Sequence, residues 1–112
     1  MPIKLGKYSF TGPIESIDKI KDRSGVYAII CEVDKEFFLI DVGESSKLRT
    51  RIENYDKKEC WKKNCKGQLK IFVHYTSFFK QRNRIIIEQE LRELFDPECK
   101  MDEKIGFTEF LF

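Results

Sequence analysis

The chain has 112 residues, which suits one compact domain and excludes a second domain of ordinary size. Its hydrophobic share of 41% is ordinary for a globular protein and excludes extensive disorder. The first residues lack the apolar run of a signal peptide, and no apolar stretch is long enough to cross a bilayer. We therefore expect a cytoplasmic protein without membrane contact.

The charge of the chain is small but unevenly distributed. The formal net charge is +2, yet residues 45–84 hold 12 Lys or Arg against three acids, a local charge of +9. A basic block inside a nearly neutral chain is typical of a phosphate-binding face. A solvated, lysine-rich loop would have the same composition, so charge alone leaves both interpretations open.

The first predicted elements are a lead-in and a β-hairpin. Residues 1–23 read as an irregular lead-in, with a turn at Gly12-Pro13 and a short helix near residues 14–20. Residues 25–31 and 37–43 form two apolar runs around a short polar turn, which predicts an antiparallel hairpin. Both runs are continuously apolar, so we expect this part of the sheet to be covered on both faces.

A helix and a loop should follow the hairpin. Ser45 or Ser46 is a suitable N-cap, and Leu48, Ile52 and Tyr55 recur on one face of a helix. Residues 56–68 are rich in Lys and predict an exposed loop. Residues 69–75 predict a third strand.

The clearest predicted helix spans residues 80–95. Its apolar stripe contains Ile87, Leu91, Leu94 and Phe95, and it should end before Pro97. The apolar tail, residues 101–112, is expected to pack back on the motif-bearing core at 24–100. The element order β-β-α-β-α predicts an α+β domain, with a small, mainly antiparallel three-stranded sheet and helices packed on it.

The four cysteines are expected to be reduced. Without an export signal, a disulfide framework is not predicted for Cys31, Cys60, Cys65 and Cys99. A zinc site is a second interpretation, with Cys60, Cys65 and Cys99 joined by His74.

Four short motifs occur in a recognisable order and spacing. They are Gly25-Val26-Tyr27, then Asp41-Val42-Gly43, then a run in which Arg51 follows that glycine by eight residues, and a helix in which Glu88 precedes Pro97 by nine. Together they resemble the GIY-YIG nucleases. That family has Gly-Ile/Val-Tyr on one strand, Tyr-Ile/Val-Gly on the next, a helix with an arginine and a later helix with a glutamate.

The chain departs from the family pattern at two positions. Asp41 stands where the family has its second tyrosine, and Lys100 stands where an asparagine often follows the proline. An acid at Asp41 could bind the metal or act as the base, giving a working variant. It could also repel the scissile phosphate and abolish catalysis at the site.

The resemblance implies an endonuclease that depends on Mg²⁺ or Mn²⁺ and acts on DNA in preference to RNA. Glu88 would bind the metal, whose preferred ligands are oxygens. Arg51 would neutralise a phosphate oxygen, and Tyr27 would orient or deprotonate the attacking water. Tyr27 could act as a base near neutral pH only if Arg51 or the metal lowered its pKa from about 10.

Each of these residues also has a purely structural interpretation. Tyr27 could be an ordinary strand tyrosine, and Arg51 could line a solvated helix face. Glu88 lies four residues from both Arg84 and Arg92, so helical ion pairs would account for it. Asp41 is harder to dismiss, because a charge inside an apolar run needs a partner.

The basic block supplies the predicted nucleic-acid contacts. Trp61, inside the block, could stack on a base or anchor the loop on the core. The opposing hypotheses are a nucleic-acid-binding module without catalysis and a protein-interaction domain that uses the apolar tail. A short chain would leave targeting to a partner protein or a homodimer. The side chains expected to contact phosphates are Lys47, Arg49, Lys57, Lys58, Lys62, Lys63 and Lys66.

Overall fold

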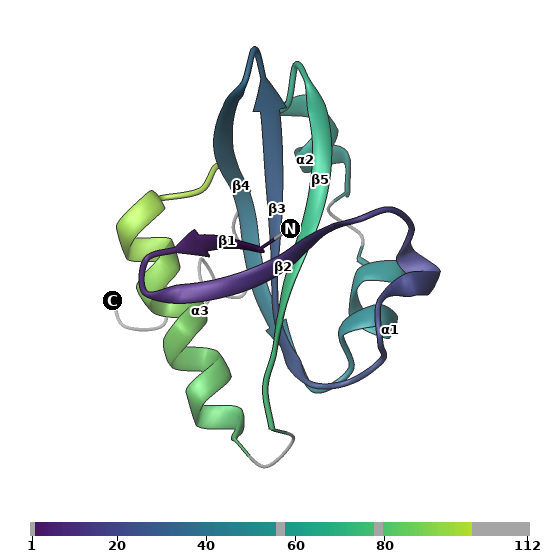
Figure 1. The fold of residues 1–112 in the computed structure, drawn as a ribbon, viewed down its shortest axis with the longest axis vertical. Helices are drawn as coiled ribbons and strands as arrows, with labels where there is room; N and C mark the ends of the chain where they lie inside the picture. The colour runs from purple at the N-terminus through teal and green to yellow at the C-terminus, as the bar shows by residue number, and fades with distance from the viewer. Residues whose placement is uncertain (1, 56–57, 78–79, 100–112) are drawn as a thin grey trace, which may run out of the picture.

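The computed structural model of the chain describes residues 2–55, 58–77 and 80–99 (Figure 1). These residues form five strands and three α-helices, with a short 3₁₀ turn between the second and third strands. The elements are β1 (Pro2–Leu5), β2 (Tyr8–Ile14), η1 (Ile17–Lys19), β3 (Gly25–Val33), β4 (Glu36–Ser45), α1 (Leu48–Glu53), α2 (Lys58–Lys63), β5 (Gln68–Tyr75) and α3 (Gln81–Phe95).

The sheet is five-stranded, with the order β1-β2-β5-β3-β4 and antiparallel pairing throughout. The prediction of three strands was therefore wrong, although the α+β class holds. The missing strands come from the lead-in, where Gly6 adopts a left-handed φ of 62° between β1 and β2. Ile3 and Leu5, then Tyr8 and Phe10, alternate with polar residues around that glycine. This period-two pattern is the signal for a hairpin.

The central hairpin agrees with its prediction. Asp34 and Lys35 have φ values of 50° and 70°, which suit the two-residue turn that matches strand twist. The register pairs Tyr27 with Gly43 and Ile29 with Asp41. It thereby brings the two strand motifs side by side.

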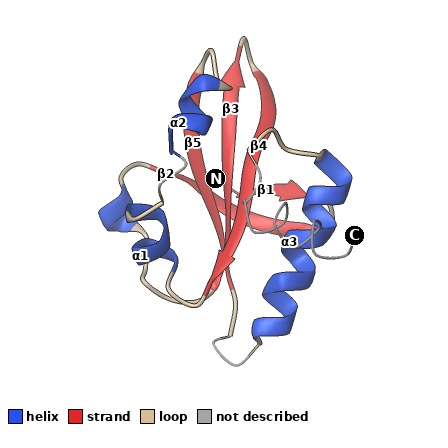
Figure 2. Cartoon of the chain, turned by 180° about the vertical axis from the view of Figure 1, so that it is seen from behind, coloured by secondary structure: helices blue, strands red, loops and turns tan. Residues whose placement is uncertain are grey.

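The two faces of β3 enter two separate cores. Val26, Ala28 and Ile30 pack in one cluster with the buried side chains of α3. Tyr27 and Ile29 alternate with them and pack in the other cluster, beneath α1 and α2. Figure 2 shows α3 beside β4 and the two short helices on the other part of the sheet. Both faces are covered along residues 25–31 and 40–43, as predicted, whereas Phe37 and Phe38 at the start of the second run are 57% and 50% exposed.

The two short helices differ from their predictions. α1 begins at Leu48 with Lys47 as N-cap, and Ser45 instead accepts a hydrogen bond at Oγ from the Lys47 backbone N–H, at 3.0 Å. α2 lies within the segment predicted to be an exposed loop. Trp61 explains the difference, because its side chain is only 5% exposed and anchors the segment on the core. Anchoring was one of the two expectations for this residue.

Helix α3 ends as predicted, but its buried stripe was only half right. Ile87 and Leu91 are buried, whereas Leu94 is 62% exposed. Two arginines, Arg84 and Arg92, are buried on α3 instead. The reason is that α3 packs beside β4, which offers polar partners to those guanidinium groups.

The cysteines are paired, contrary to the expectation of free thiols. Cys31 forms a disulfide with Cys65, and Cys60 forms one with Cys99. The zinc interpretation also fails, because three of its four ligands are in these disulfides and His74 bonds through Nδ1 to the Ser9 carbonyl at 2.8 Å. Among the helices that the structure describes, none has the length and apolar character needed to cross a membrane.

Candidate functional site

Tyr27 and Gly43 form the centre of the candidate site. Tyr27 is fully buried, and its ring lies across Gly43 on the neighbouring strand. A Cβ at Gly43 would come within 2.3 Å of the Tyr27 hydroxyl. The glycine is therefore required by the close approach of the phenol.

Asp41 lies beneath an aromatic cover. Its carboxylate is fully buried, and Oδ2 accepts a hydrogen bond from Trp61 Nε1 at 2.8 Å. Burial raises the pKa of Asp41, while the Trp61 indole and the Tyr55 hydroxyl oppose the rise. Tyr55 lies beside the carboxylate without the geometry of a full hydrogen bond. The Tyr55 and Trp61 rings are stacked, with centroids 4.9 Å apart.

Three buried oxygens of this cluster lack a hydrogen-bond partner in the described part of the chain. They are the hydroxyls of Tyr27 and Tyr55 and the Oδ1 atom of Asp41. Buried polar groups are nearly always paired with protein or ordered water. Three in one cluster therefore mark a place where a water or a bound oxygen-containing group would gain hydrogen bonds.

Two charged residues of the predicted constellation, Arg51 on α1 and Glu88 on α3, influence Tyr27 from separate helices. Burial is the main reason that the pKa of Tyr27 is raised, and Asp41, Tyr55 and Glu88 add to the rise. Arg51, from α1, opposes it. Three predicted site residues, from β4, α1 and α3, thus act electrostatically on the fourth, the phenol of Tyr27 on β3.

Arg51 also borders a polar pocket. Its guanidinium lies 5.5 Å from the Tyr55 ring centroid, a cation–π distance. On the solvent side is a pocket of about 350 Å³, where Arg51 and the exposed Lys47 supply positive charge. Hydroxyl and amide groups complete its lining, from Ser45, Ser46, Thr50 and Asn54.

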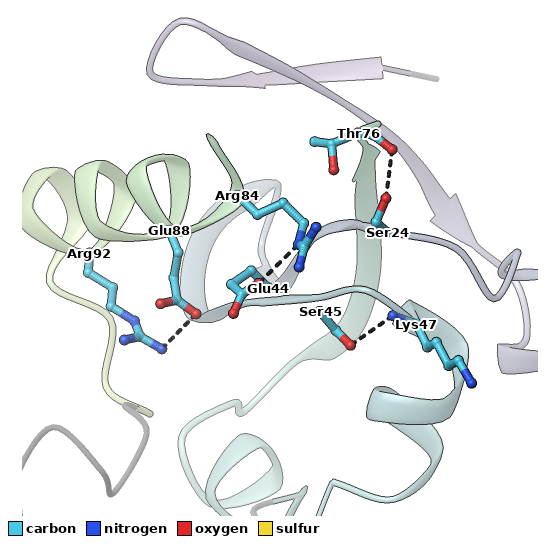
Figure 3. Close-up of polar contacts among 8 residues, drawn as sticks. All are labelled: Ser24, Glu44, Ser45, Lys47, Thr76, Arg84, Glu88 and Arg92. Carbon is cyan, nitrogen blue, oxygen red and sulfur yellow. Dashed lines mark hydrogen bonds and ion pairs between the residues drawn. The ribbon is translucent and has the colours of Figure 1, made fainter. Parts of the chain in front are cut away.

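Glu88 is held in a row of charges along α3. Figure 3 shows Arg84, Glu88 and Arg92 extending from α3 toward β4. Arg92 Nη2 lies 3.2 Å from Glu88 Oε2 and donates to the Val42 carbonyl at 3.1 Å. Arg84 Nε donates to Glu44 Oε1 at 3.0 Å. The helical ion pair that was the structural interpretation of Glu88 is therefore present with Arg92, on a carboxylate that is 13% exposed.

The electrostatics restrict what Tyr27 can do. The expectation allowed Arg51 to lower the Tyr27 pKa enough for base catalysis. Burial outweighs Arg51, and the net pKa of the phenol is raised. In this state Tyr27 is a neutral hydrogen-bonding group throughout the ordinary pH range.

Most of the predicted phosphate contacts are accessible. Arg49 is half-buried, and so is Lys58, whose Nζ donates to the Glu53 carbonyl at 3.1 Å. Lys57 and Lys100 lie outside the described residues. The exposed members of the set are Lys47, Lys62, Lys63 and Lys66.

Three residues of the cluster were not predicted to belong to the site. Tyr55 was predicted only as part of the apolar face of a helix, yet α1 ends at Glu53 and Tyr55 lies beyond it, where its ring contacts the Arg51 guanidinium. Trp61 was assigned to the loop, and Arg92 only to an ion pair. A buried acid that needs a partner, Asp41, was the available signal for a donor such as Trp61.

Comparison of the chain with protein-family models, with curated protein sequences and with solved structures gives no match.

Proposed function

We propose that this protein is a divalent-metal-dependent endonuclease that hydrolyses phosphodiester bonds, with DNA as the favoured substrate. The observation that carries the proposal is the full burial of Tyr27 and Asp41 on the same face of the paired strands β3 and β4, where the charges of Arg51 and Glu88 also influence the pKa of the phenol. An ordinary strand tyrosine needs no such surroundings. Ionisable groups with perturbed pKa values gather preferentially at functional sites.

The polar pocket beside Arg51 supplies the phosphate site of the proposal. Arg51 and Lys47 give positive charge, and the hydroxyls of Ser45 and Ser46 can donate hydrogen bonds to phosphate oxygens, whereas the Thr50 hydroxyl donates to Asp22. The exposed lysines of the α2 segment add positive charge, and in the proposal they would follow the nucleic-acid backbone.

Glu88 is the residue proposed to hold Mg²⁺ or Mn²⁺. A partly exposed carboxylate suits a hard cation that keeps several waters. When bound, the ion would stabilise negative charge on the phosphate and activate water. Arg92 shares the carboxylate, so it fixes Glu88 and also competes with a cation for it.

Asp41 and Tyr27 divide the proton chemistry in this proposal. Tyr27, neutral because it is buried, orients the attacking water through its hydroxyl. Asp41, whose pKa is raised by burial, accepts the proton through a neighbouring phenol. Bases tuned upward by burial are common in catalysis. The substitution of the family's second tyrosine by Asp41 then gives a working variant.

A specific observation favours a second function, a nucleic-acid-binding module without catalysis. Tyr27 and Asp41 both have an exposed fraction of 0%, and Glu88 is paired with Arg92. A site that stays closed in this way cannot touch a scissile phosphate. The basic surface would still bind nucleic acid with steep salt dependence.

The cellular location and the partners of the protein follow from the same proposal. We propose a cytoplasmic location and a targeting protein or a second copy of the chain as the source of substrate specificity. Sedimentation of the purified protein with and without DNA would test for the second copy.

The deciding experiment is cleavage of labelled DNA and RNA substrates with Mn²⁺. Wild type is compared with Glu88→Ala, and with Glu93→Ala as a matched control, since Glu93 is an exposed carboxylate on the same helix. Cleavage that is lost only in Glu88→Ala supports the nuclease. No cleavage by any of the three proteins, together with tight and salt-sensitive gel shifts, supports the binding module instead.

A further inference from the structure

Helix α2 is tied to the rest of the protein by both disulfides. Cys60, inside the helix, is bonded to Cys99, and Cys65, just after the helix, is bonded to Cys31 on β3. The helix has six residues, well short of the roughly 12 to 15 that an isolated helix needs to be even marginally stable. Its position therefore depends on the contacts that hold it down.

The Cys60–Cys99 disulfide closes a ring of contacts around Asp41. Trp61, the neighbour of Cys60, donates its indole N–H to Asp41. Cys99 forms a β-bridge with Asp41, and its backbone N–H donates to the Ile40 carbonyl at 2.9 Å. The disulfide therefore joins Cys60, the neighbour of the hydrogen-bond donor Trp61, to Cys99, which pairs with the acceptor Asp41.

Non-covalent anchoring of α2 is concentrated in one side chain. In the described part of the chain, the buried residue of the helix is Trp61, which stacks on Tyr55 and bonds to Asp41. The neighbouring Lys62 and Lys63 are exposed and contribute little to the packing of α2 on the sheet. Cys60 and Cys65, one from each disulfide, thus flank Trp61, the residue of α2 that bonds to Asp41 in the candidate site.

We propose that the two disulfides make α2 a redox-dependent clamp on the Asp41 carboxylate. A dithiol reductant opens each clamp bond: the S–S bond takes two electrons and two protons and becomes two thiols, while the dithiol closes to its own disulfide. Without these ties α2 leaves the sheet, and Asp41 loses the indole donor. The lysines of α2 leave with it. This inference does not depend on the nuclease proposal, because it concerns the free protein.

Trp61 is the single tryptophan of the chain, so it reports on the clamp directly. Oxidised protein and protein treated with dithiothreitol are compared by iodoacetamide alkylation, by emission wavelength and by acrylamide quenching. We expect no alkylated thiol before reduction and four after it, with several-fold stronger quenching and a red-shifted emission after reduction. Full alkylation without reductant, or four freed thiols with unchanged quenching, would overturn the proposal.

Hydrogen exchange separates release of the clamp from unfolding of the whole domain. After reduction, we expect the amides of α2 to lose protection while those of β3 and β5 keep theirs. Loss of protection across the sheet would mean that the disulfides only staple the fold, and would overturn the proposal.

A serine variant tests the ring of contacts without a reductant. Cys60→Ser with Cys99→Ser should reproduce most of the increase in quenching. A matched pair, Lys62→Ser with Glu98→Ser, replaces exposed residues beside the same cysteines and should leave quenching unchanged. Equal quenching in the cysteine pair and wild type contradicts the clamp, provided that the sheet keeps its exchange protection.

Discussion

The two faces of the central sheet differ in chemistry although the same strands build both. The face under α3 is lined by aliphatic and phenylalanine side chains, such as Val26, Val42 and Phe72. The opposite face, under α1 and α2, contains Tyr27 and the fully buried Asp41. Successive residues of a strand point to opposite faces, so a single step along β4 separates the apolar Val42 from Asp41.

The face under α1 and α2 is the less favourable of the two for stability. Buried charge on the side of α3 is limited, among the described residues, to Arg84 and Arg92, which form ion pairs with Glu44 and Glu88. The other face keeps a buried carboxylate and hydroxyls without full hydrogen-bond partners. Such groups lower the stability of the fold, and apolar groups of similar shape would stabilise it more. Departures from local consistency of this kind are expected at functional sites. The difference between the faces therefore favours a functional role for the Tyr27–Asp41 cluster.

Removal of an apolar side chain under α3 should have the largest effect on stability. Leu91→Ala leaves a cavity in the buried cluster and should lower the free energy of unfolding by about 2–5 kcal/mol. Leu94→Ala, on the same helix but exposed, should change it by less than about 0.5 kcal/mol. Urea denaturation followed by circular dichroism measures both. Equal effects would mean that α3 does not pack as described.

The contact between Tyr27 and Gly43 can be broken by one methyl group. Gly43→Ala would drive a Cβ into the phenol and should cost about 1–3 kcal/mol of unfolding free energy. In a Tyr27→Ala background most of that further cost should vanish, because the clashing ring is gone. A double-mutant cycle by urea denaturation gives the coupling, and additive effects would show that the ring does not lie over Gly43.

Neutralising Asp41 should change how stability depends on pH. Burial raises the folded-state pKa of Asp41 above that of the unfolded chain, which is near 3.9. The folded protein then binds the proton more strongly, so this group lowers stability as pH rises from about 4 through the folded-state pKa. Its cost is fully present above that pKa.

Asp41→Asn should remove this dependence and raise the unfolding free energy at neutral pH by about 1–2 kcal/mol. The amide oxygen of asparagine can still accept the Trp61 hydrogen bond. Urea titrations of both proteins between pH 4 and 8 give the difference curve. A flat difference would show that Asp41 titrates alike in the folded and unfolded states.

The smallest expected effect on stability comes from removing one hydroxyl on the same face. Tyr27→Phe deletes an oxygen that has no hydrogen-bond partner in the described residues, so stability should stay within about 1 kcal/mol of wild type or rise. If the proposed nuclease role holds, metal-dependent cleavage should nevertheless be lost. Unchanged cleavage would assign Tyr27 to packing alone.

The local pattern predicted the central hairpin, the third predicted strand and the long helix. The hairpin runs are apolar, the third strand and the long helix have recurring apolar residues, and the turn or stop residues, Asp34, Lys35 and Pro97, act through backbone geometry that neighbours do not change. The strands in residues 2–14 were missed, because the chain reverses over only two residues there and the alternation is short. The cysteine pairing was missed because spacing does not determine connectivity.

The sequence alone brought Tyr27, Asp41, Arg51 and Glu88 into one hypothesis, since residue type and spacing survive without coordinates. Only the tertiary structure decided that Asp41 is covered by Trp61, that Arg92 shares Glu88, and that two disulfides hold α2 in place. The Trp61–Asp41 bond and the disulfides join residues 20 to 39 positions apart in the chain. The pairing of Arg92 with Glu88 depends on which face of α3 meets β4. Such partners are chosen by the packing of the whole chain, which no local pattern records.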